Sequence, residues 1–178
     1  MVEDAGEGQA VRRVIYRGRK IDLALQEIRL PGGTTEEREV VVHNGAVALV
    51  PMVDRDHVCL IRNFRYSVGR TLLELPAGTI DAGEDPDATA DRELAEETGY
   101  RAGRIARIAE WWVSPGVMNE RMYLYLCEDL TPGETDHQPD ERIEPVVLAW
   151  DDAMAATRDG RIQDAKTMLA MLLCDRMR

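Results

Sequence analysis

The 178 residues are 44% hydrophobic, 31% charged and only 5% aromatic, a composition typical of one globular domain. The formal net charge of −11, from 33 acidic and 22 basic residues, disfavours binding to nucleic-acid backbones. No stretch approaches the ~20 apolar residues of a membrane span, and the N-terminus lacks the basic and apolar regions of a secretory signal. We therefore expect neither a nucleic-acid nor a membrane partner.

The three cysteines, Cys59, Cys127 and Cys174, are far apart in the sequence, and each lies among apolar residues. No two of them have the spacing of metal ligands. They are predicted to be small core residues with free thiols, which are common in a reducing compartment. This pattern favours a cytoplasmic location.

The first 44 residues predict a small unit of β-strands. Strand-forming residues occur at 11–16, 21–30 and 36–43, and Pro31-Gly32-Gly33-Thr34 predicts a turn between the last two strands. A unit of this size seldom holds a core alone. We expect it to pack on the rest of the chain or on a second subunit.

Residues 45–178 predict the main domain, of the α/β (α+β) class. Two apolar runs with a charged turn between them predict a hairpin over 46–63. Asp85 and Pro86 predict the start of the longest helix, and Gly99 predicts its left-handed end. The other expected elements are strands at 104–112, 121–127 and 146–150, an acidic loop over 128–144, and short helices that begin at Asp151 and Asp164. This order predicts a mixed β-sheet with helices packed on it.

Three glutamates lie within one turn of the longest predicted helix. Glu93 is three and four residues from Glu96 and Glu97, so the three side chains share a face. Like charges at this spacing destabilise a helix, and Arg92 can offset part of the repulsion through a contact with Glu96. Glu84 can fold back toward the same face. Such a cluster of carboxylates becomes favourable when hard divalent cations lie between them. The alternative interpretation is an acidic helix face that is simply solvated.

The spacing of glycine and charged residues over 78–99 favours a metal site over a solvated acidic face. Gly78, Glu84 and the run Arg92-Glu93-Leu94-Ala95-Glu96-Glu97-Thr98-Gly99 occupy every charged and glycine position of the Nudix box. Only the final aliphatic position departs, because it is Tyr100, and that position has a packing role. The chain therefore resembles the Nudix hydrolases. The resemblance implies an α/β/α sandwich around a mixed β-sheet, formed here by residues 45–178 and preceded by the strand unit 1–44.

The resemblance also implies a set of metal ligands. Glu93 and Glu97 are expected to be the principal ligands, and Glu96 an additional or water-mediated one that takes part in catalysis. The backbone carbonyl of Ala77 matches a further ligand position. The implied cofactor is Mg²⁺, with Mn²⁺ as a substitute, at two to three ions per site.

The remaining box residues are expected to support these ligands. Arg92 resembles the residue that orients the carboxylates during catalysis, and Glu84 resembles a support for the preceding loop. Gly78 and Gly99 are structural positions of the motif. A purely structural salt bridge between Arg92 and Glu84 is the alternative interpretation.

Residues 62–70, before the box, and 114–121, after it, resemble the corresponding segments of the ADP-ribose pyrophosphatase branch of the family. Arg65 matches an arginine that contacts the diphosphate, and a planar guanidinium suits bidentate phosphate contact. Glu74 is expected to hold the substrate or a metal-bound water, with a structural pair as the alternative. Pro115 lies 16 residues after Gly99, where this branch carries a marker proline, and the loop from there to Glu120 resembles its substrate loop. In this branch the N-terminal strands exchange across a homodimer, so we expect a homodimer.

The general base in the resembled branch comes from a mobile loop after the box. The acidic segment 136–144 fits that place. Glu141 aligns best, with Asp140 and Glu144 as rivals, and a solvated loop is the alternative. His137 could serve as a base on general grounds, although a surface histidine is the simpler interpretation.

The expected reaction is metal-dependent hydrolysis of ADP-ribose to AMP and ribose 5-phosphate. Three alternatives stay open: another nucleotide sugar such as ADP-glucose or GDP-mannose, an oxidised nucleoside triphosphate, and a Nudix domain that senses a ligand without catalysis. The complete box disfavours the sensor. The segment around Arg65 and the position of Pro115 disfavour the triphosphate.

Overall fold

The computed structural model describes residues 12–137 and 142–178, which form two compact units. The smaller unit contains the described residues up to Asn44 together with 112–120, and the larger unit contains 45–111 and 121–178. Within the described ranges, no helix is long and apolar enough to cross a membrane.

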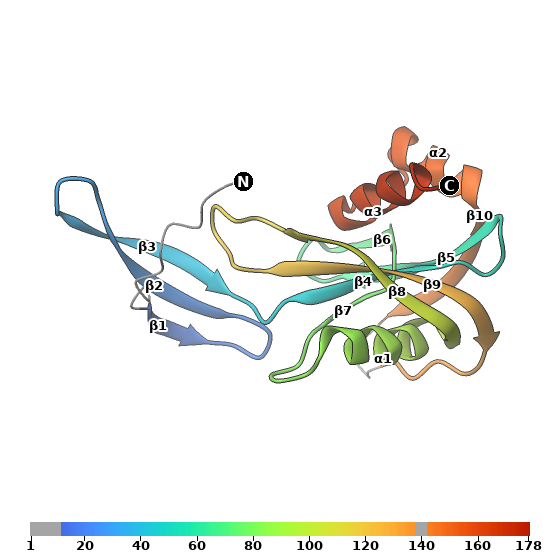
Figure 1. Cartoon of the computed structure of the whole chain (residues 1–178), viewed down its shortest axis with the longest axis horizontal. Coiled ribbons are helices and arrows are strands. Elements are labelled where there is room, and N and C mark those ends of the chain that lie inside the picture. Colours follow the sequence, from blue (N-terminus) through green and yellow to red (C-terminus); the bar gives the residue numbers. More distant parts are fainter. Residues whose placement is uncertain (1–11, 138–141) are drawn as a thin grey trace. The chain divides into compact units, whose positions relative to one another are not determined.

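The smaller unit is built on a three-stranded antiparallel sheet, as the sequence predicted. Its strands are β1 (Arg12–Arg17), β2 (Asp22–Arg29) and β3 (Thr35–Val42), in that spatial order (Figure 1). Among the described residues of this unit, only Ala24 is buried. A sheet with so little buried apolar surface has almost no core of its own.

The larger unit contains two sheets. The first is mixed, because its strand β4 runs parallel to one neighbour and antiparallel to the other. In spatial order its strands are β7 (Ala77–Thr79), β4 (Ala46–Pro51), β9 (Arg121–Pro132) and β8 (Tyr100–Trp112). The second sheet is antiparallel and consists of β10 (Ile143–Ala149), β5 (His57–Arg65) and β6 (Arg70–Glu74).

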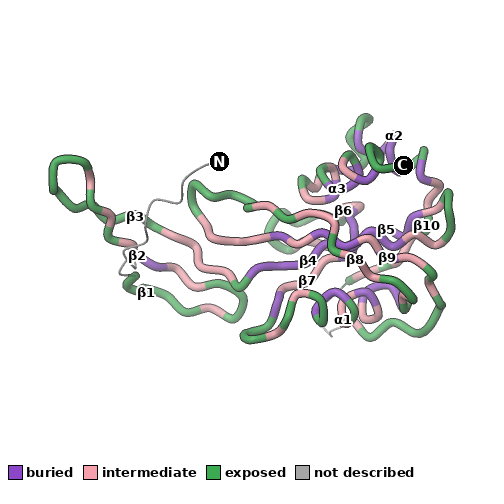
Figure 2. Tube along the Cα trace, viewed as in Figure 1, coloured by how far each residue is buried: buried purple, intermediate pink, exposed green. Residues whose placement is uncertain are grey.

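The burial of β4 shows how the layers are arranged. All of its residues are buried (Figure 2), because successive side chains point to opposite faces and helices cover both faces. Its even-numbered residues join a core with α2 (Trp150–Asp159) and α3 (Ala165–Asp175). Its residues Val47 and Leu49 join a core with α1 (Pro86–Thr98). The α/β/α sandwich expected from the resemblance is therefore present (Figure 1).

Two expected elements differ most from the structure, while the strands expected at 104–112 and 146–150 are present as β8 and β10 with shifted bounds. The hairpin over 46–63 is wrong: β4 and β5 belong to different sheets, and an isolated bridge between Met52 and Val58 joins them. Strand β4 pairs with β7 and β9, which are distant in sequence, and β5 pairs with the following strand β6 and with the distant β10, so local patterning did not reveal the partners of β4. The acidic loop also begins later than predicted, because β9 continues to Pro132. The carboxylate of Glu128 accepts a hydrogen bond from Arg104 of β8 at 2.9 Å, so this acidic residue is accommodated within the sheet.

The three cysteines are buried, as predicted, and their thiols are free. Burial raises the pKa of Cys59 and Cys174 to about 11 and that of Cys127 to about 12. Because the thiolate is the reactive form, native protein at mildly alkaline pH should not release thionitrobenzoate from Ellman's reagent. Protein unfolded in guanidinium chloride should react at all three thiols. Rapid reaction of one thiol in the native protein would contradict the burial.

Candidate active site

Helix α1 begins and ends at the residues that its sequence predicted. The Asp85 carboxylate accepts a hydrogen bond from the Asp87 backbone N–H at 2.8 Å, and Pro86 occupies the first helical position. Gly99 ends the helix with φ 74°. A Cβ at Gly99 would also lie 2.8 Å from the Gly133 carbonyl oxygen, so both conformation and space require glycine there.

Arg92 gathers three carboxylates around its guanidinium. Its Nε and Nη2 donate to Glu84 at 3.1 and 3.0 Å. Its Nη1 donates to Glu93 at 2.7 Å and to Glu96 at 3.2 Å. The contact with Glu96 and the folding back of Glu84 are therefore present as the sequence predicted. One cation thus balances part of the charge that the acidic cluster concentrates.

The contact between Arg92 and Glu84 shifts the pKa of both residues. The hydrogen bond from Arg92 lowers the pKa of Glu84 to about 2, and the contacts with Glu84 and then Glu93 raise the pKa of Arg92. A carboxyl whose pKa is lower in the folded state stabilises the fold above its unfolded-state pKa. For Glu84 this stabilisation is lost as the pH falls from 4.5, the ordinary pKa of a glutamate, to about 2.

We therefore expect a difference in acid sensitivity between wild-type protein and the Glu84→Gln variant. The melting temperature of the wild type should fall more steeply than that of the variant between about pH 4.5 and pH 2, because only the wild type loses the charge of Glu84 in this range. Differential scanning calorimetry across this pH range measures the effect. Parallel curves for the two proteins would contradict the assigned contact.

Strand β7 contacts the carboxylate face of α1 at two successive residues. The backbone N–H of Ala77 donates to Oε2 of Glu97 at 2.8 Å. At Gly78, an added Cβ would lie 1.8 Å from Cδ and 2.0 Å from Oε1 of Glu93. The Glu93 carboxylate therefore occupies the space that any larger residue at position 78 would fill. Glu97 is itself buried, with only 4% exposure.

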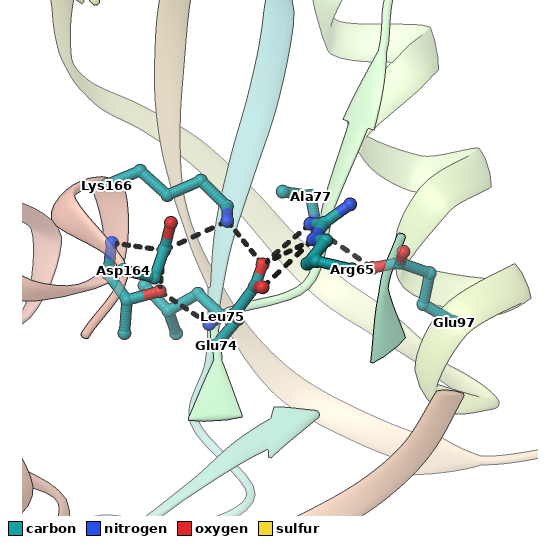
Figure 3. Close-up of polar contacts among 8 residues, drawn as sticks. Arg65, Glu74, Leu75, Ala77, Glu97, Asp164 and Lys166 are labelled. Carbon is teal, nitrogen blue, oxygen red and sulfur yellow. Dashed lines mark hydrogen bonds and ion pairs between the residues drawn. The ribbon is translucent and has the colours of Figure 1, made fainter. Parts of the chain in front are cut away.

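A second polar cluster lies at the end of β6. Glu74 is 1% exposed, and it accepts from Nε and Nη2 of Arg65 at 2.9 and 2.6 Å (Figure 3). The bond with Glu74 raises the pKa of Arg65, and the charge of Glu97 adds to the shift. Lys166 of α3 donates to the same Glu74 carboxylate at 2.6 Å. Glu74 therefore forms ion pairs with Arg65 and Lys166, in agreement with the alternative interpretation of Glu74 as a structural residue.

Lys166 was missed by the sequence reasoning. The only local signal was its position two residues after the predicted helix cap Asp164, with which it also forms an ion pair at 2.9 Å. A lysine near the start of a helix is usually solvated, so that signal is weak. Its buried partner Glu74 is distant in sequence.

The expected general base lies in a segment that is only partly described. Glu141 and its rival Asp140 lie outside the described residues, and the rival Glu144 forms an ion pair with Arg62 at 3.6 Å. The segment that leads to them is anchored at the end of α1. His137 Nε2 lies 3.1 Å from the Glu97 carbonyl oxygen, so His137 is not a freely solvated surface histidine.

The two residues of the expected substrate loop belong to the smaller unit. Pro115 lies in a turn in which the carbonyl of Ser114 accepts from the N–H groups of Val117 and Met118 at 3.1 and 3.0 Å. The carbonyl of Glu120 accepts from the Val113 N–H at 3.0 Å. These bonds order the loop within its own unit.

A model of the NUDIX domain matches residues 42–171. The chain belongs to the Nudix family. A protein of Bacillus subtilis strain 168 named ADP-ribose pyrophosphatase is 35% identical to this Nudix chain, over 93% of the chain and 90% of that protein. A protein of Bacillus methanolicus named methanol dehydrogenase activator is 34% identical, over 88% of the chain and 86% of that protein. The family predicted from the box is confirmed.

A solved structure supports the fold of this Nudix chain along its length. The structure, described as an ADP compounds hydrolase, matches with a TM-score of 0.82 and covers 98% of this chain and 96% of that chain. At 23% identity, the match concerns the fold alone.

The residues around β7 and α1 fit a divalent cation by their chemistry. Carboxylates and a backbone carbonyl are hard oxygen donors, which suit Mg²⁺ or Mn²⁺ better than softer metals. Gly78 leaves room for the Glu93 carboxylate against the backbone beside Ala77. In the described ranges, however, no three acidic, histidine or cysteine side chains already converge as a metal site. Glu93 and Glu96 each accept a hydrogen bond from Arg92 through one carboxylate oxygen, which holds both carboxylates on the same side of α1.

Proposed function

We propose that this Nudix protein hydrolyses the diphosphate linkage of a nucleoside-diphosphate sugar, with ADP-ribose as the leading substrate. One observation carries the proposal: the guanidinium of Arg65 lies close enough to Glu97 for their charges to interact (Figure 3). Arg65, a cation that can bind phosphate oxygens, therefore lies next to Glu97, one of the carboxylates proposed to bind divalent ions. The name of the Bacillus subtilis relative supports ADP-ribose, whereas the name of the Bacillus methanolicus relative states no substrate.

The chemistry requires that water adds to one phosphorus while the bridging P–O bond breaks. From ADP-ribose this yields AMP and ribose 5-phosphate. We propose that Glu93 and Glu97, with Glu96 and the carbonyl of Ala77, bind two to three Mg²⁺ ions, for which Mn²⁺ can substitute. Ions bound there would supply neutralisation of the diphosphate and a lower pKa for the attacking water.

The protein residues have distinct parts in this proposal. Arg65 binds the diphosphate and so holds the scissile bond near the carboxylates. Arg92 orients Glu93 and Glu96 through the hydrogen bonds described above. Glu74 keeps Arg65 in place, and Pro115 and Glu120 belong to a loop that contacts the sugar-nucleotide.

We propose Glu141 as the general base that takes the proton of the attacking water. Replacement by glutamine should lower kcat by about 10²- to 10⁴-fold, the usual contribution of general-base catalysis, with little change in KM. Asp140→Asn and Glu144→Gln are the matched controls and should retain most activity. An equal loss from either control would assign the base to that residue.

We further propose a homodimer and a cytoplasmic location. The apolar side chains of Val14, Ile15 and Tyr16 on β1 are 36%, 47% and 63% exposed, and a second subunit could cover them. The free cysteines suit a reducing compartment. Light scattering coupled to size exclusion tests the dimer, and a mass near 20.0 kDa, that of one chain, would contradict it.

A substrate panel tests the proposed function. Phosphate is measured after phosphatase treatment, with Mg²⁺ or Mn²⁺, on ADP-ribose, ADP-glucose, GDP-mannose, NADH, diadenosine polyphosphates and oxidised dGTP. We expect the highest kcat/KM for ADP-ribose. Preference for another nucleotide sugar would change the substrate but keep the reaction. Activity only on oxidised dGTP would contradict the role of the Arg65 segment, and no activity would favour a ligand sensor.

A further inference from the structure

A partly buried lysine, Lys166, lies near the arginine that we assign to the diphosphate. Lys20 and Lys166 are the only lysines among the 22 basic residues of the sequence. The Lys166 side chain is 13% exposed, and its Nζ donates to Glu74 at 2.6 Å and to Asp164 at 2.9 Å. A lysine with so little exposure and two carboxylate partners has lost much of its hydration and rotamer freedom, so its position is well defined.

Glu74 connects Lys166 to Arg65. Its carboxylate lies between the two cations (Figure 3): Oε2 accepts from both Lys166 Nζ and Arg65 Nη2, and Oε1 accepts from Arg65 Nε. A carboxylate with 1% exposure requires such partners, because an unpaired buried charge is strongly destabilising. Two cations on one carboxylate restrict its orientation more than one cation could.

The contact with Glu74 determines which edge of the Arg65 guanidinium is presented. Nε and Nη2 form one edge, and both donate to Glu74. Within residues 12–137 and 142–178, no hydrogen bond from Nη1 is found, and the Arg65 side chain is 36% exposed. A guanidinium held along one edge offers its other donors in a fixed direction, which suits phosphate recognition.

The first turn of α3 anchors the other end of this chain of contacts. Asp164 accepts from the backbone N–H of Thr167 at 3.0 Å and from its hydroxyl at 2.6 Å. The Thr167 hydroxyl oxygen accepts in turn from the Leu75 N–H at 2.8 Å. The start of α3 therefore holds both the side chain of Glu74 and the backbone of the next residue.

We infer that Lys166 is a positioning residue for substrate binding: together with Asp164 it fixes the Glu74 carboxylate, which in turn fixes Arg65 for the diphosphate of the substrate. This inference rests on the proposed function. Arg65 and Lys166 balance the charges of Glu74 and Asp164, so loss of Lys166 leaves one excess negative charge beside an anionic substrate. Because Arg65 contacts the diphosphate before and during reaction, the effect falls on KM more than on kcat.

A double-mutant cycle between Lys166 and Arg65 tests the inference. Lys166→Met should raise the KM for ADP-ribose about tenfold with kcat within about threefold, as expected for loss of uniform binding. In an Arg65→Gln background, the same change should alter KM by no more than about twofold, because coupled residues are not additive. Tenfold effects in both backgrounds, or no effect of Lys166→Met in the wild type, would overturn the inference.

Two further variants separate positioning from general destabilisation. Lys166→Arg retains the charge and should return KM to within about threefold of the wild type, although the two side chains differ in shape. Arg161→Met is the matched control, because Arg161 is a half-exposed cation near the start of α3 that pairs with Asp159. It should leave KM unchanged. A KM for Lys166→Arg as high as that of Lys166→Met would contradict the role of the charge.

A binding measurement provides a readout that does not depend on turnover. With lysine-selective ¹³C labelling, Lys166 and Lys20 are the only labelled positions in the NMR spectrum. α,β-Methylene-ADP with Ca²⁺ should shift the Lys166 signal in the wild type and not in Arg65→Gln at the same probe concentration. A shift of equal size in both proteins would overturn the link through Arg65.

The outcomes distinguish this inference from the proposed function. If the wild type cleaves nucleotide sugars but Lys166→Met leaves KM unchanged, and the Lys166 signal shifts equally in the wild type and in Arg65→Gln, the inference alone fails. If the wild type cleaves no nucleotide sugar and binds no α,β-methylene-ADP, the proposed function fails, and the inference fails with it.

Discussion

Glu97→Gln is expected to abolish turnover while the protein remains folded. Glutamine keeps a side-chain oxygen that can accept the Ala77 N–H, which lies 2.8 Å from Oε2 of Glu97. Replacing a charged acceptor by a neutral one costs about 1 kcal/mol, a shift of a few degrees in melting temperature for a domain of this size. The loss of a metal ligand, by contrast, removes several kcal/mol of transition-state stabilisation. We expect kcat to fall by at least about 10³-fold.

Steady-state kinetics and calorimetry on the same preparation measure the two effects separately. Glu128→Gln is the matched control, because Glu128 is a glutamate of the same unit that pairs with Arg104 on β8. The control should retain wild-type kcat. Substantial activity in Glu97→Gln would contradict the assignment of Glu97 as a metal ligand.

Gly78→Ala is expected to remove activity with little loss of stability. The new Cβ would lie 1.8 Å from Cδ of Glu93, so the Glu93 carboxylate must move. The displaced atoms form the end of a flexible side chain, and Gly78 is not among the residues with positive φ, so the backbone can accept alanine. We expect kcat/KM to fall about 10²-fold or more, as for other displaced catalytic groups, while the melting temperature changes by a few degrees.

A second background shows whether this loss acts through Glu93. In Glu93→Gln the carboxylate is already absent, so Gly78→Ala should add little to the loss of kcat/KM. Full additivity of the two substitutions would place the effect of Gly78→Ala elsewhere. Wild-type activity in Gly78→Ala would contradict the observed proximity of Gly78 to Glu93.

Local sequence signals predicted α1 and the contacts on its surface correctly. The cap at Asp85, the proline at position 86 and the ending at Gly99 act within a few residues, as does the pairing of Arg92 with Glu96. The family followed from the same segment, because the box is defined by fixed local spacing. The pairing of strands could not be predicted from local signals. For example, β4 and β5 are close in sequence but lie in different sheets.

The contacts that complete the site join residues distant in sequence. Thr167 and Lys166 of α3 contact Leu75 and Glu74 at the end of β6. Neither helix periodicity nor strand alternation links these segments, since only the packing of α3 brings them together. Glu74 was therefore identified as a candidate without either of its cationic partners, Arg65 and Lys166. Glu141 stays a prediction because it lies outside the described residues.

The most direct test of the proposed chemistry is the release of AMP from ADP-ribose by the wild-type protein, with Mg²⁺ present and then after addition of excess EDTA. We expect AMP and ribose 5-phosphate in equal amounts with Mg²⁺, loss of the reaction with EDTA, and recovery when Mg²⁺ is restored. AMP release that continues unchanged in EDTA would contradict a reaction that depends on divalent ions bound by Glu93, Glu96 and Glu97.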